Sequence, residues 1–189
     1  NDFHGNLEPP KQSAMVQDEA GTVVGLPAGG AAYLASALDA VRTRYPNNVT
    51  VAAGDLIGGT PITSALFVDE PAIGALNLLG LDLAAVGNHE FDGGVAELRR
   101  KQIGGCDKLT AREPCQVERF AGAKFGYLAA NVFTPDGKTL FPGTALRSFG
   151  SGRRRVTVGF IGMTLEGTVS NVAQFGAFVN EIRSLLGAS

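Results

Sequence analysis

Histidine and cysteine are scarce in this chain of 189 residues, which contains two of each. Both cysteines, Cys106 and Cys115, lie in a loop-like stretch with no histidine nearby, so a zinc knuckle would lack ligands. They are either two free thiols or a local disulfide that holds a long exposed loop. We expect the disulfide, which indicates an oxidising compartment.

The chain also lacks a strong charge of either sign and a long apolar run. Its formal net charge of −2 gives no electrostatic footprint for nucleic acid or for an anionic membrane. No apolar stretch approaches the roughly 18 residues of a membrane-spanning helix, so we expect no span. Apolar residues make up 44% of the chain and charged residues 18%, which is ordinary for one well-buried domain.

What the chain does contain is three short clusters of polar residues. Two of them directly follow apolar runs that are typical of buried parallel strands, and the third opens the chain. The carboxyl ends of parallel strands meet at one edge of a sheet, where α/β proteins bind their ligands. We therefore expect the clusters, which hold both histidines, to converge on one metal site. In chain order, the clusters cover residues 1–6, 53–59 and 87–92.

The spacing of apolar residues predicts strands that alternate with helices, which is typical of a parallel, helix-covered sheet. The predicted strands cover residues 49–53, 83–86, 127–132 and 154–163. The predicted helices cover residues 31–44, 64–79, 95–102 and 175–186. The predicted loops cover residues 8–27, 104–122 and 134–152. The run of arginines at 153–155 is expected to be a solvated or edge feature rather than an anion site.

The clusters carry residue types that bind hard to borderline metal ions. Asp2 and His4 are two positions apart on an extended segment, so their side chains lie on the same side. Asp55 follows a glycine, and the two oxygens of a carboxylate can bridge two cations. Asn88 offers a neutral carbonyl oxygen. Carboxylate, imidazole and amide together favour ions such as Mn, Fe or Zn, and two such ions suit in-line displacement on phosphorus.

A proton-transfer group is expected beside these ligands. His89 follows the ligand Asn88 and is predicted to protonate a leaving oxygen or to stabilise phosphoryl charge, and it need not bind metal. Asp92 is predicted to hold the other ring nitrogen of His89. Glu90, between them, is expected to pack or to fix the loop.

These motifs resemble those of the calcineurin-like metallophosphoesterases, in particular the secreted bacterial 5′-nucleotidase branch. The resemblance covers the chain to about Val172. It implies an α/β fold, the four-layer α/β/β/α sandwich, incomplete in this chain. It also implies two divalent metal ions (Mn, Zn, Fe, Mg or Ca), held by Asp2, His4, Asp55 and Asn88, with Asp55 as the bridge, and a catalytic dyad of His89 and Asp92. The matching segments are 1–7, 54–58, 87–92, the Cys106–Cys115 loop, 127–132 and 159–164.

The chain departs from the family in one respect. The family takes further metal ligands from histidines of later motifs, and this chain has no histidine after His89. We therefore expect residues 1–189 to be the N-terminal part of a metallophosphoesterase domain, with the family's C-terminal nucleotide-binding domain outside them. We expect this length of chain alone to be weakly metallated or inactive.

The function expected from the resemblance is metal-dependent hydrolysis of phosphate monoesters, above all nucleoside 5′-monophosphates, by a periplasmic or secreted enzyme. The expected partner is a small phosphate ester and not a nucleic-acid polymer. Two alternatives stay open: a 2′,3′-cyclic phosphodiesterase or other exported phosphoesterase, and a non-catalytic module that kept the fold without all the ligands. A dinucleotide-binding protein is disfavoured, because no Gly-x-Gly-x-x-Gly follows a predicted strand.

Overall fold

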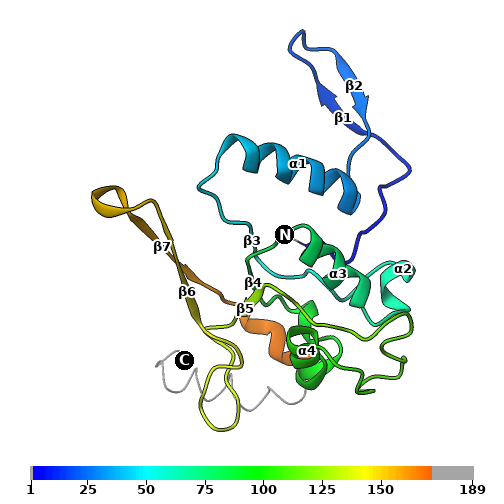
Figure 1. Ribbon diagram of the computed structural model, residues 1–189. Helices are drawn as coiled ribbons and strands as arrows, with labels where there is room; N and C mark the ends of the chain where they lie inside the picture. Colours follow the sequence, from blue (N-terminus) through cyan, green and yellow to red (C-terminus); the bar gives the residue numbers. More distant parts are fainter. Residues whose placement is uncertain (1, 172–189) are drawn as a thin grey trace.

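A parallel three-stranded sheet, in the order β3-β4-β5, lies at the centre of the computed structural model, which describes residues 2–171 (Figure 1). The strands pair in parallel, with Val51 opposite Leu83 and Ala84 opposite Tyr127. These strands confirm three of the predicted ones, although each is shorter than predicted. The predicted helix at 175–186 lies outside the described residues. The strands are β3 (Val51–Ala52), β4 (Leu83–Ala85) and β5 (Gly126–Leu128).

Helices flank this sheet along the chain. The predictions for 31–44 and 95–102 are confirmed to within a residue at each end. The single helix predicted over 64–79 is wrong: Val68 and Asp69 adopt positive φ angles of 54° and 56°, which interrupt a right-handed helix. A second helix then begins with Pro71 in its first turn, where proline is well accommodated. The helices are α1 (Gly30–Arg44), α2 (Ile62–Ala65), α3 (Glu70–Leu78) and α4 (Gly94–Ile103), with 3₁₀ helices at His89–Phe91, Gly152–Arg154 and Glu166–Asn171.

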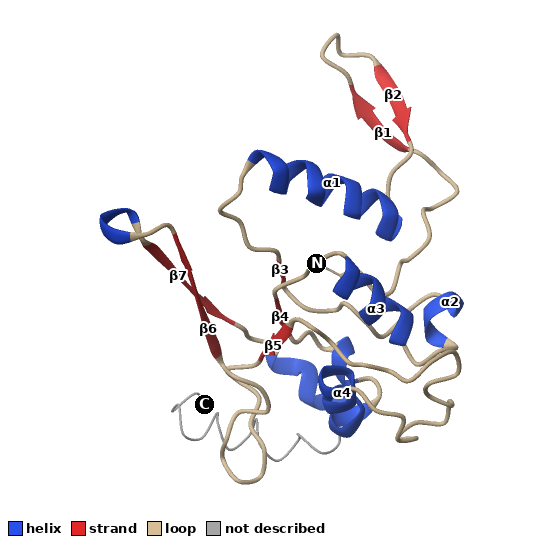
Figure 2. Cartoon of the chain, in the orientation of Figure 1, coloured by secondary structure: helices blue, strands red, loops and turns tan. Residues whose placement is uncertain are grey.

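Two antiparallel hairpins project from the body of the molecule (Figure 2). The loop predicted over 8–27 is wrong, because a hairpin forms there. The Asp18 carboxylate closes its turn by accepting the N–H groups of Ala20 and Thr22, at 2.9 and 2.8 Å. The hairpin strands are β1 (Ala14–Gln17), β2 (Val23–Leu26), β6 (Thr144–Phe149) and β7 (Val156–Ile161).

The second hairpin confirms the strand predicted over 154–163 and corrects the loop predicted over 134–152. Six residues of that loop form β6, which pairs with β7 along its whole length. The arginines at 153–155 lie at the exposed tip between the two strands, as expected for a solvated feature.

The hydrophobic core lies among α3, α4, β4 and β5. Helix α1 contributes no buried residue, and Tyr33 and Val41 are 44% and 52% exposed. Its partly buried Ala35 and Leu38 pack against the core, and the guanidinium of Arg42 donates hydrogen bonds to the carbonyl of Leu79 and the hydroxyl of Thr50, both at 2.7 Å. Among the described residues, no helix is long and apolar enough to cross a membrane. The most buried core residues include Ala72, Ile73, Val86, Leu98, Phe125, Tyr127 and Ala129.

A buried ion cluster joins α3 and α4. Arg100 donates to both carboxylate oxygens of Glu97, at 2.9 and 2.7 Å, and to Glu70 at 2.6 Å. Lys101 adds an ion pair to Glu97 at 2.5 Å. Burial alone would raise the pKa of Glu97, but the hydrogen bonds from Arg100 and Lys101 lower that pKa below its ordinary value. The carboxylate of Glu97 is therefore the anion that makes two buried cations tolerable.

Substituting Glu97→Gln is expected to lower the free energy of unfolding by about 3–5 kcal/mol, because it leaves Lys101 and Arg100 buried without their shared partner. Since the pKa of Glu97 is lowered in the fold, this contribution is present above the ordinary pKa and lost as the pH falls through the folded value. Urea unfolding measures the change. Glu118→Gln, at an exposed position, is the matched control. A loss below about 1 kcal/mol for Glu97→Gln would contradict this account.

Candidate active site

The three polar clusters meet in space. The imidazole rings of His4 and His89 lie edge to face, with their centroids 4.9 Å apart. The backbone N–H of His4 donates to the carbonyl of Asp55 at 3.0 Å. The Asp55 carboxylate in turn accepts the backbone N–H of His89 at 2.9 Å. Residues separated by more than 80 positions in the sequence are therefore neighbours at one edge of the sheet.

Two glycines allow the loops after β3 and β4 to approach this closely. A Cβ atom on Gly54 would lie 2.5 Å from the backbone nitrogen of Gly87. A Cβ atom on Gly87 would overlap the carboxylate of Asp55. Side chains at either position would push the two loops apart, so the sequence needs glycine at both.

Glu90 ties the same two loops together. Its carboxylate accepts the backbone N–H groups of Asp55 (2.8 Å), Leu56 (2.7 Å) and Gly87 (2.6 Å). The side chain is only 2% exposed, and burial raises the pKa of Glu90 to about 7 although all three N–H groups favour the charged form. Glu90 thus fixes the loops, as the sequence analysis expected.

His4 is oriented as a ligand would be. Its Nδ1 lies 2.7 Å from the carbonyl oxygen of Gly58. A carbonyl only accepts hydrogen bonds, so Nδ1 carries a proton, and in the neutral ring Nε2 is the nitrogen with the lone pair. This is the arrangement by which a backbone carbonyl prepares a histidine for metal binding.

Three of the four predicted ligands have strained backbones. Asp2, His4 and Asp55 adopt positive φ angles of 50°, 44° and 52°. Such conformations are sparsely populated by residues other than glycine, and strain of this kind gathers at functional sites. Val68, Asp69 and Cys115 share this conformation, so it accompanies the predicted ligands without being confined to them.

The predicted ligands do not form a complete metal site among the described residues. The side chains of Asp2 and Asn88 make no hydrogen bond within the described part of the chain, although the backbone N–H of Asp2 donates to Gly54 at 3.3 Å. Across residues 2–171, no group of three or more His, Cys, Asp or Glu side chains is arranged to hold a metal ion. His4 and Asp55 are thus each oriented by their own hydrogen bonds. The four-ligand set stays a prediction.

His89 and Asp92 form a close pair. Nδ1 of His89 lies 2.9 Å from Oδ2 of Asp92. This hydrogen bond to Asp92 raises the pKa of His89 above its ordinary value. The side chains are 39% and 48% exposed, so the pair is accessible to a ligand.

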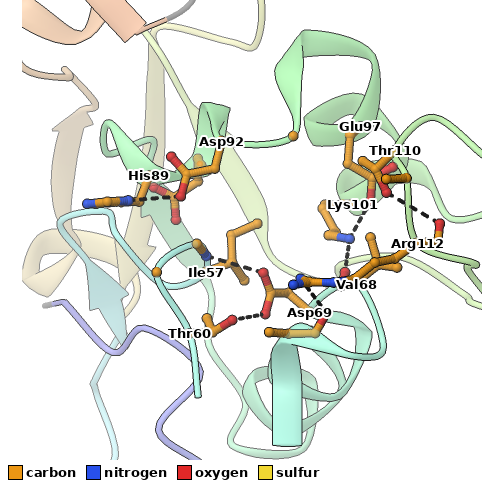
Figure 3. Close-up of a pocket in the computed structure, with 16 residues that line it drawn as sticks. Ile57, Thr60, Val68, Asp69, His89, Asp92, Glu97, Lys101, Thr110 and Arg112 are labelled. Atoms are coloured by element: carbon orange, nitrogen blue, oxygen red, sulfur yellow. Dashed lines mark hydrogen bonds and ion pairs between the residues drawn. The ribbon is translucent and has the colours of Figure 1, made fainter. Parts of the chain in front are cut away.

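A pocket of about 450 Å³ opens beside this pair (Figure 3). One wall is formed around α2, where Asp69, between α2 and α3, accepts hydrogen bonds from Thr60 at 2.6 Å and from Ser64 at 2.8 Å. The loop after α4 contributes Thr110 and Arg112 to the lining. The residues that line the pocket include Ile57, Thr60, Val68, Asp69, His89, Asp92, Glu97, Lys101, Thr110 and Arg112.

The loop after α4 carries the disulfide expected between Cys106 and Cys115, which is present in the structure. Glu70 accepts the backbone N–H of Cys115 at 3.0 Å, and Arg100 donates to the carbonyl of Gly105 at 2.8 Å. The buried ion cluster therefore anchors both ends of the bridged loop.

Sequence reasoning missed most of this pocket, including Asp69 and Arg112. Asp69, followed by Glu70 and Pro71, has the pattern of a helix start, and that signal was available in the sequence. Arg112 lies in an irregular loop and carried no signal.

No protein-family model matches the chain. It is 48% identical over 155 residues to the "uncharacterized protein in pqq-V 5′ region" of Acinetobacter calcoaceticus, covering 79% of this chain and 76% of that protein. It is 36% identical over 98 residues to rat 5′-nucleotidase, covering 52% of this chain. It is 32% identical over 120 residues to a Yersinia enterocolitica 2′,3′-cyclic-nucleotide 2′-phosphodiesterase/3′-nucleotidase, covering 59% of this chain. The chain spans only 16% of each of these two enzymes.

Solved structures share the fold. NAD nucleotidase of Haemophilus influenzae superposes over 90% of this chain and 26% of its own, with a TM-score of 0.62 and 22% identity. The calcineurin-like phosphoesterase YfkN of Bacillus subtilis covers 89% of this chain and 48% of its own, with a TM-score of 0.59 and 23% identity. A 5′-nucleotidase precursor of Thermus thermophilus covers 89% of this chain and 28% of its own, with a TM-score of 0.58 and 28% identity.

The mixed α/β fold is that of the calcineurin-like phosphoesterases and 5′-nucleotidases among the solved structures. Its sequence relatives include 5′-nucleotidases and a 2′,3′-cyclic-nucleotide 2′-phosphodiesterase/3′-nucleotidase. The resemblance and the fold class expected from the sequence are thereby confirmed.

Proposed function

We propose that this chain supplies the metal-binding and proton-transfer residues of an exported hydrolase of phosphate monoesters, with nucleoside 5′-monophosphates as the substrate class. The observation that carries the proposal is the meeting of His4, Asp55 and the His89–Asp92 pair at one sheet edge. The names of the rat and Thermus relatives support the choice of substrate.

Asp2, His4, Asp55 and Asn88 would hold two divalent ions in this proposal. The donor set fits such ions: two carboxylates, an amide oxygen and an imidazole whose Nε2 is left with its lone pair. When bound, the ions offset the charge of the phosphoryl oxygens and lower the pKa of a coordinated water.

His89 gives its proton to the alcohol oxygen that leaves phosphorus. Asp92 fixes the ring by accepting from Nδ1, so Nε2 is the nitrogen that faces the substrate. Asp92 also raises the pKa of His89, which keeps more of the imidazole protonated near neutral pH, as a proton donor requires. Glu90 holds the two loops so that Asp55 and His89 keep their spacing.

An oxidising, extracytoplasmic location is part of the proposal. The Cys106–Cys115 disulfide supports it, since such bonds persist in oxidising compartments. The Thermus relative is named a precursor, which agrees with export. The Yersinia relative's name makes cyclic-nucleotide hydrolysis the second candidate, which a substrate panel separates from the first.

The test is metal removal from the protein at its natural length. Dialysis against a chelator is expected to abolish hydrolysis of adenosine 5′-monophosphate, and added manganese to restore it, because the ligand set holds the ions that polarise phosphorus. Elemental analysis of the same samples is expected to find two ions per chain before chelation. Undiminished turnover by metal-free protein would refute metal dependence. Metal-loaded protein that hydrolyses no phosphate ester would favour the non-catalytic module.

A further inference from the structure

The segment that orients His4 contains two consecutive glycines. The carbonyl oxygen of Gly58 lies 2.7 Å from Nδ1 of His4 and selects the nitrogen that carries the proton in the neutral ring. Gly58 and Gly59 adopt positive φ angles of 76° and 56°, and neither has a side chain that could hold the turn by packing. The direction of the Gly58 carbonyl, and with it the orientation of His4, therefore depends on the groups that restrain this turn.

The carboxylate of Asp69 restrains the turn at both ends. Its Oδ2 accepts the backbone N–H of Gly58 at 3.3 Å. Its Oδ1 accepts a hydrogen bond from the hydroxyl of Thr60 at 2.6 Å, which Figure 3 shows as a dashed line. These two donors lie on either side of the Gly58 carbonyl along the chain. One side chain thus bridges the residues that flank the hydrogen-bond acceptor of His4.

Asp69 makes these contacts instead of the one that its position favours. It is the N-cap residue of α3, and an aspartate there ordinarily accepts an N–H group from the first turn of its own helix. The side chain of Asp69 makes no such capping hydrogen bond. Its third hydrogen bond comes from the hydroxyl of Ser64, at 2.8 Å. All three donors therefore lie before α3 in the chain, and the carboxylate serves the preceding loop rather than its own helix.

The turn has no room for a side chain that could replace this restraint. A Cβ atom on Gly58 would lie 2.4 Å from the carbonyl oxygen of His89. A Cβ atom on Gly59 would lie 3.6 Å from Nδ1 of His4 and 3.7 Å from Cε1 of His89. The turn thus lies against both histidines, and position 58 needs glycine for space. Because glycine restrains its own backbone least, the carboxylate of Asp69 supplies the rigidity that the turn lacks.

We propose that Asp69 is a positioning residue for His4 and acts through the carbonyl of Gly58. In the proposed function, on which this inference rests, His4 is a metal ligand. By holding the turn, Asp69 keeps the proton on Nδ1 of the neutral ring and leaves Nε2 for the metal. Groups that orient metal-ligating histidines in this way typically change metal affinity by about 10–100-fold when they are removed.

Calorimetric titration of manganese into the metal-free protein of natural length tests this role. Asp69→Ala is expected to weaken manganese binding by about tenfold, at the lower end of the effect of such groups. Thr60→Val keeps the charge of Asp69 and removes one of its donors, so it is expected to weaken binding by about threefold, as for the loss of one ordinary hydrogen bond. Ser64→Ala is the matched control, because it removes a hydrogen bond of similar length to the same carboxylate oxygen, but one that comes from α2. It should leave the affinity unchanged.

The tautomer of His4 is a readout that a purely structural role of Asp69 would not change. Nitrogen NMR of the metal-free protein is expected to show Nδ1 protonated in the neutral His4 ring of the wild type and of Ser64→Ala. Asp69→Ala is expected to show a mixture of both tautomers. His4→Asn identifies the signal by its loss, and urea unfolding verifies that each variant is folded. If Asp69→Ala does not fold, Thr60→Val provides the same two measurements.

Wild-type manganese affinity in Asp69→Ala or Thr60→Val, an equal loss in Ser64→Ala, or an unchanged His4 tautomer in folded Asp69→Ala would overturn the inference. Hydrolysis of adenosine 5′-monophosphate by the same samples tests the proposed function separately. Metal-dependent turnover with a manganese affinity that is insensitive to Asp69 refutes the positioning role alone. Manganese affinity and a His4 tautomer that both depend on Asp69, without turnover of any phosphate ester, refute the hydrolase alone.

Discussion

Replacing His89 with alanine is expected to lower kcat for an alkyl phosphate monoester by about 10²–10⁴-fold, the usual contribution of a positioned proton donor. His89 is the residue that gives a proton to the leaving oxygen in the proposed function, and Asp92 fixes its ring at 2.9 Å. Without it, an alkoxide of high basicity has to depart unprotonated. Steady-state kinetics on adenosine 5′-monophosphate, with manganese at saturation, measures the effect.

A second substrate identifies the cause of the loss. The His89→Ala enzyme should retain far more of its activity on 4-nitrophenyl phosphate, because nitrophenolate leaves readily without a proton. Asp92→Asn should give a smaller loss than His89→Ala, since asparagine still offers a carbonyl oxygen to Nδ1. Equal losses on both substrates, or wild-type turnover of the nucleotide, would show that His89 is not the proton donor.

Replacing Glu90 with alanine is expected to cost at least about 3 kcal/mol of unfolding free energy. The substitution leaves the N–H groups of Asp55, Leu56 and Gly87 without their acceptor, and each unpaired buried donor costs about 1–3 kcal/mol. The loops after β3 and β4 would also lose their common anchor. Activity should therefore fall by more than the population of unfolded protein explains, at temperatures well below the melting transition.

Glu90→Gln is the control for this prediction. Glutamine has the same shape and keeps one acceptor oxygen, which can serve the amides of Asp55 and Gly87 that now share Oε2. We expect a smaller loss of stability, confined to the hydrogen bond of Leu56. Chemical denaturation and manganese titration of both variants provide the two measurements. An alanine variant as stable as the wild type would show that water replaces the carboxylate without cost.

The sequence predicted the centre of the fold better than its periphery. Residues around Ala84 and Tyr127 form short apolar runs, the first between two helices, and such runs have few alternatives to a buried parallel strand. The hairpin around Asp18 escaped prediction because its strands are exposed, so no alternation of buried and exposed residues marks them. The break between α2 and α3 was not predicted, because Val68 adopts a positive φ angle that its branched side chain disfavours.

The site was predictable to the extent that it depends on motifs. The juxtaposition of Asp55 and His89 followed from strand ends that share one sheet edge, and His4 joins them from the start of the chain. The pocket did not follow, because Arg112 reaches it from a loop whose path is set by long-range contacts with Glu70 and Arg100. Such contacts join residues as far as 45 positions apart and leave no local pattern to read.

The left-handed backbone at Asp2, His4 and Asp55 limits which amino acids can replace these residues during evolution. If these residues bind metal as proposed, a replacement must meet two independent requirements, the donor atom that the side chain presents and the torsion angle that the main chain imposes. Asparagine meets the second requirement most easily and glycine meets it freely, yet neither supplies a negative charge or an imidazole. A saturation library at these positions should thus yield variants that fold but have lost activity. A lineage that lost one of these residues would seldom regain that activity with a different amino acid.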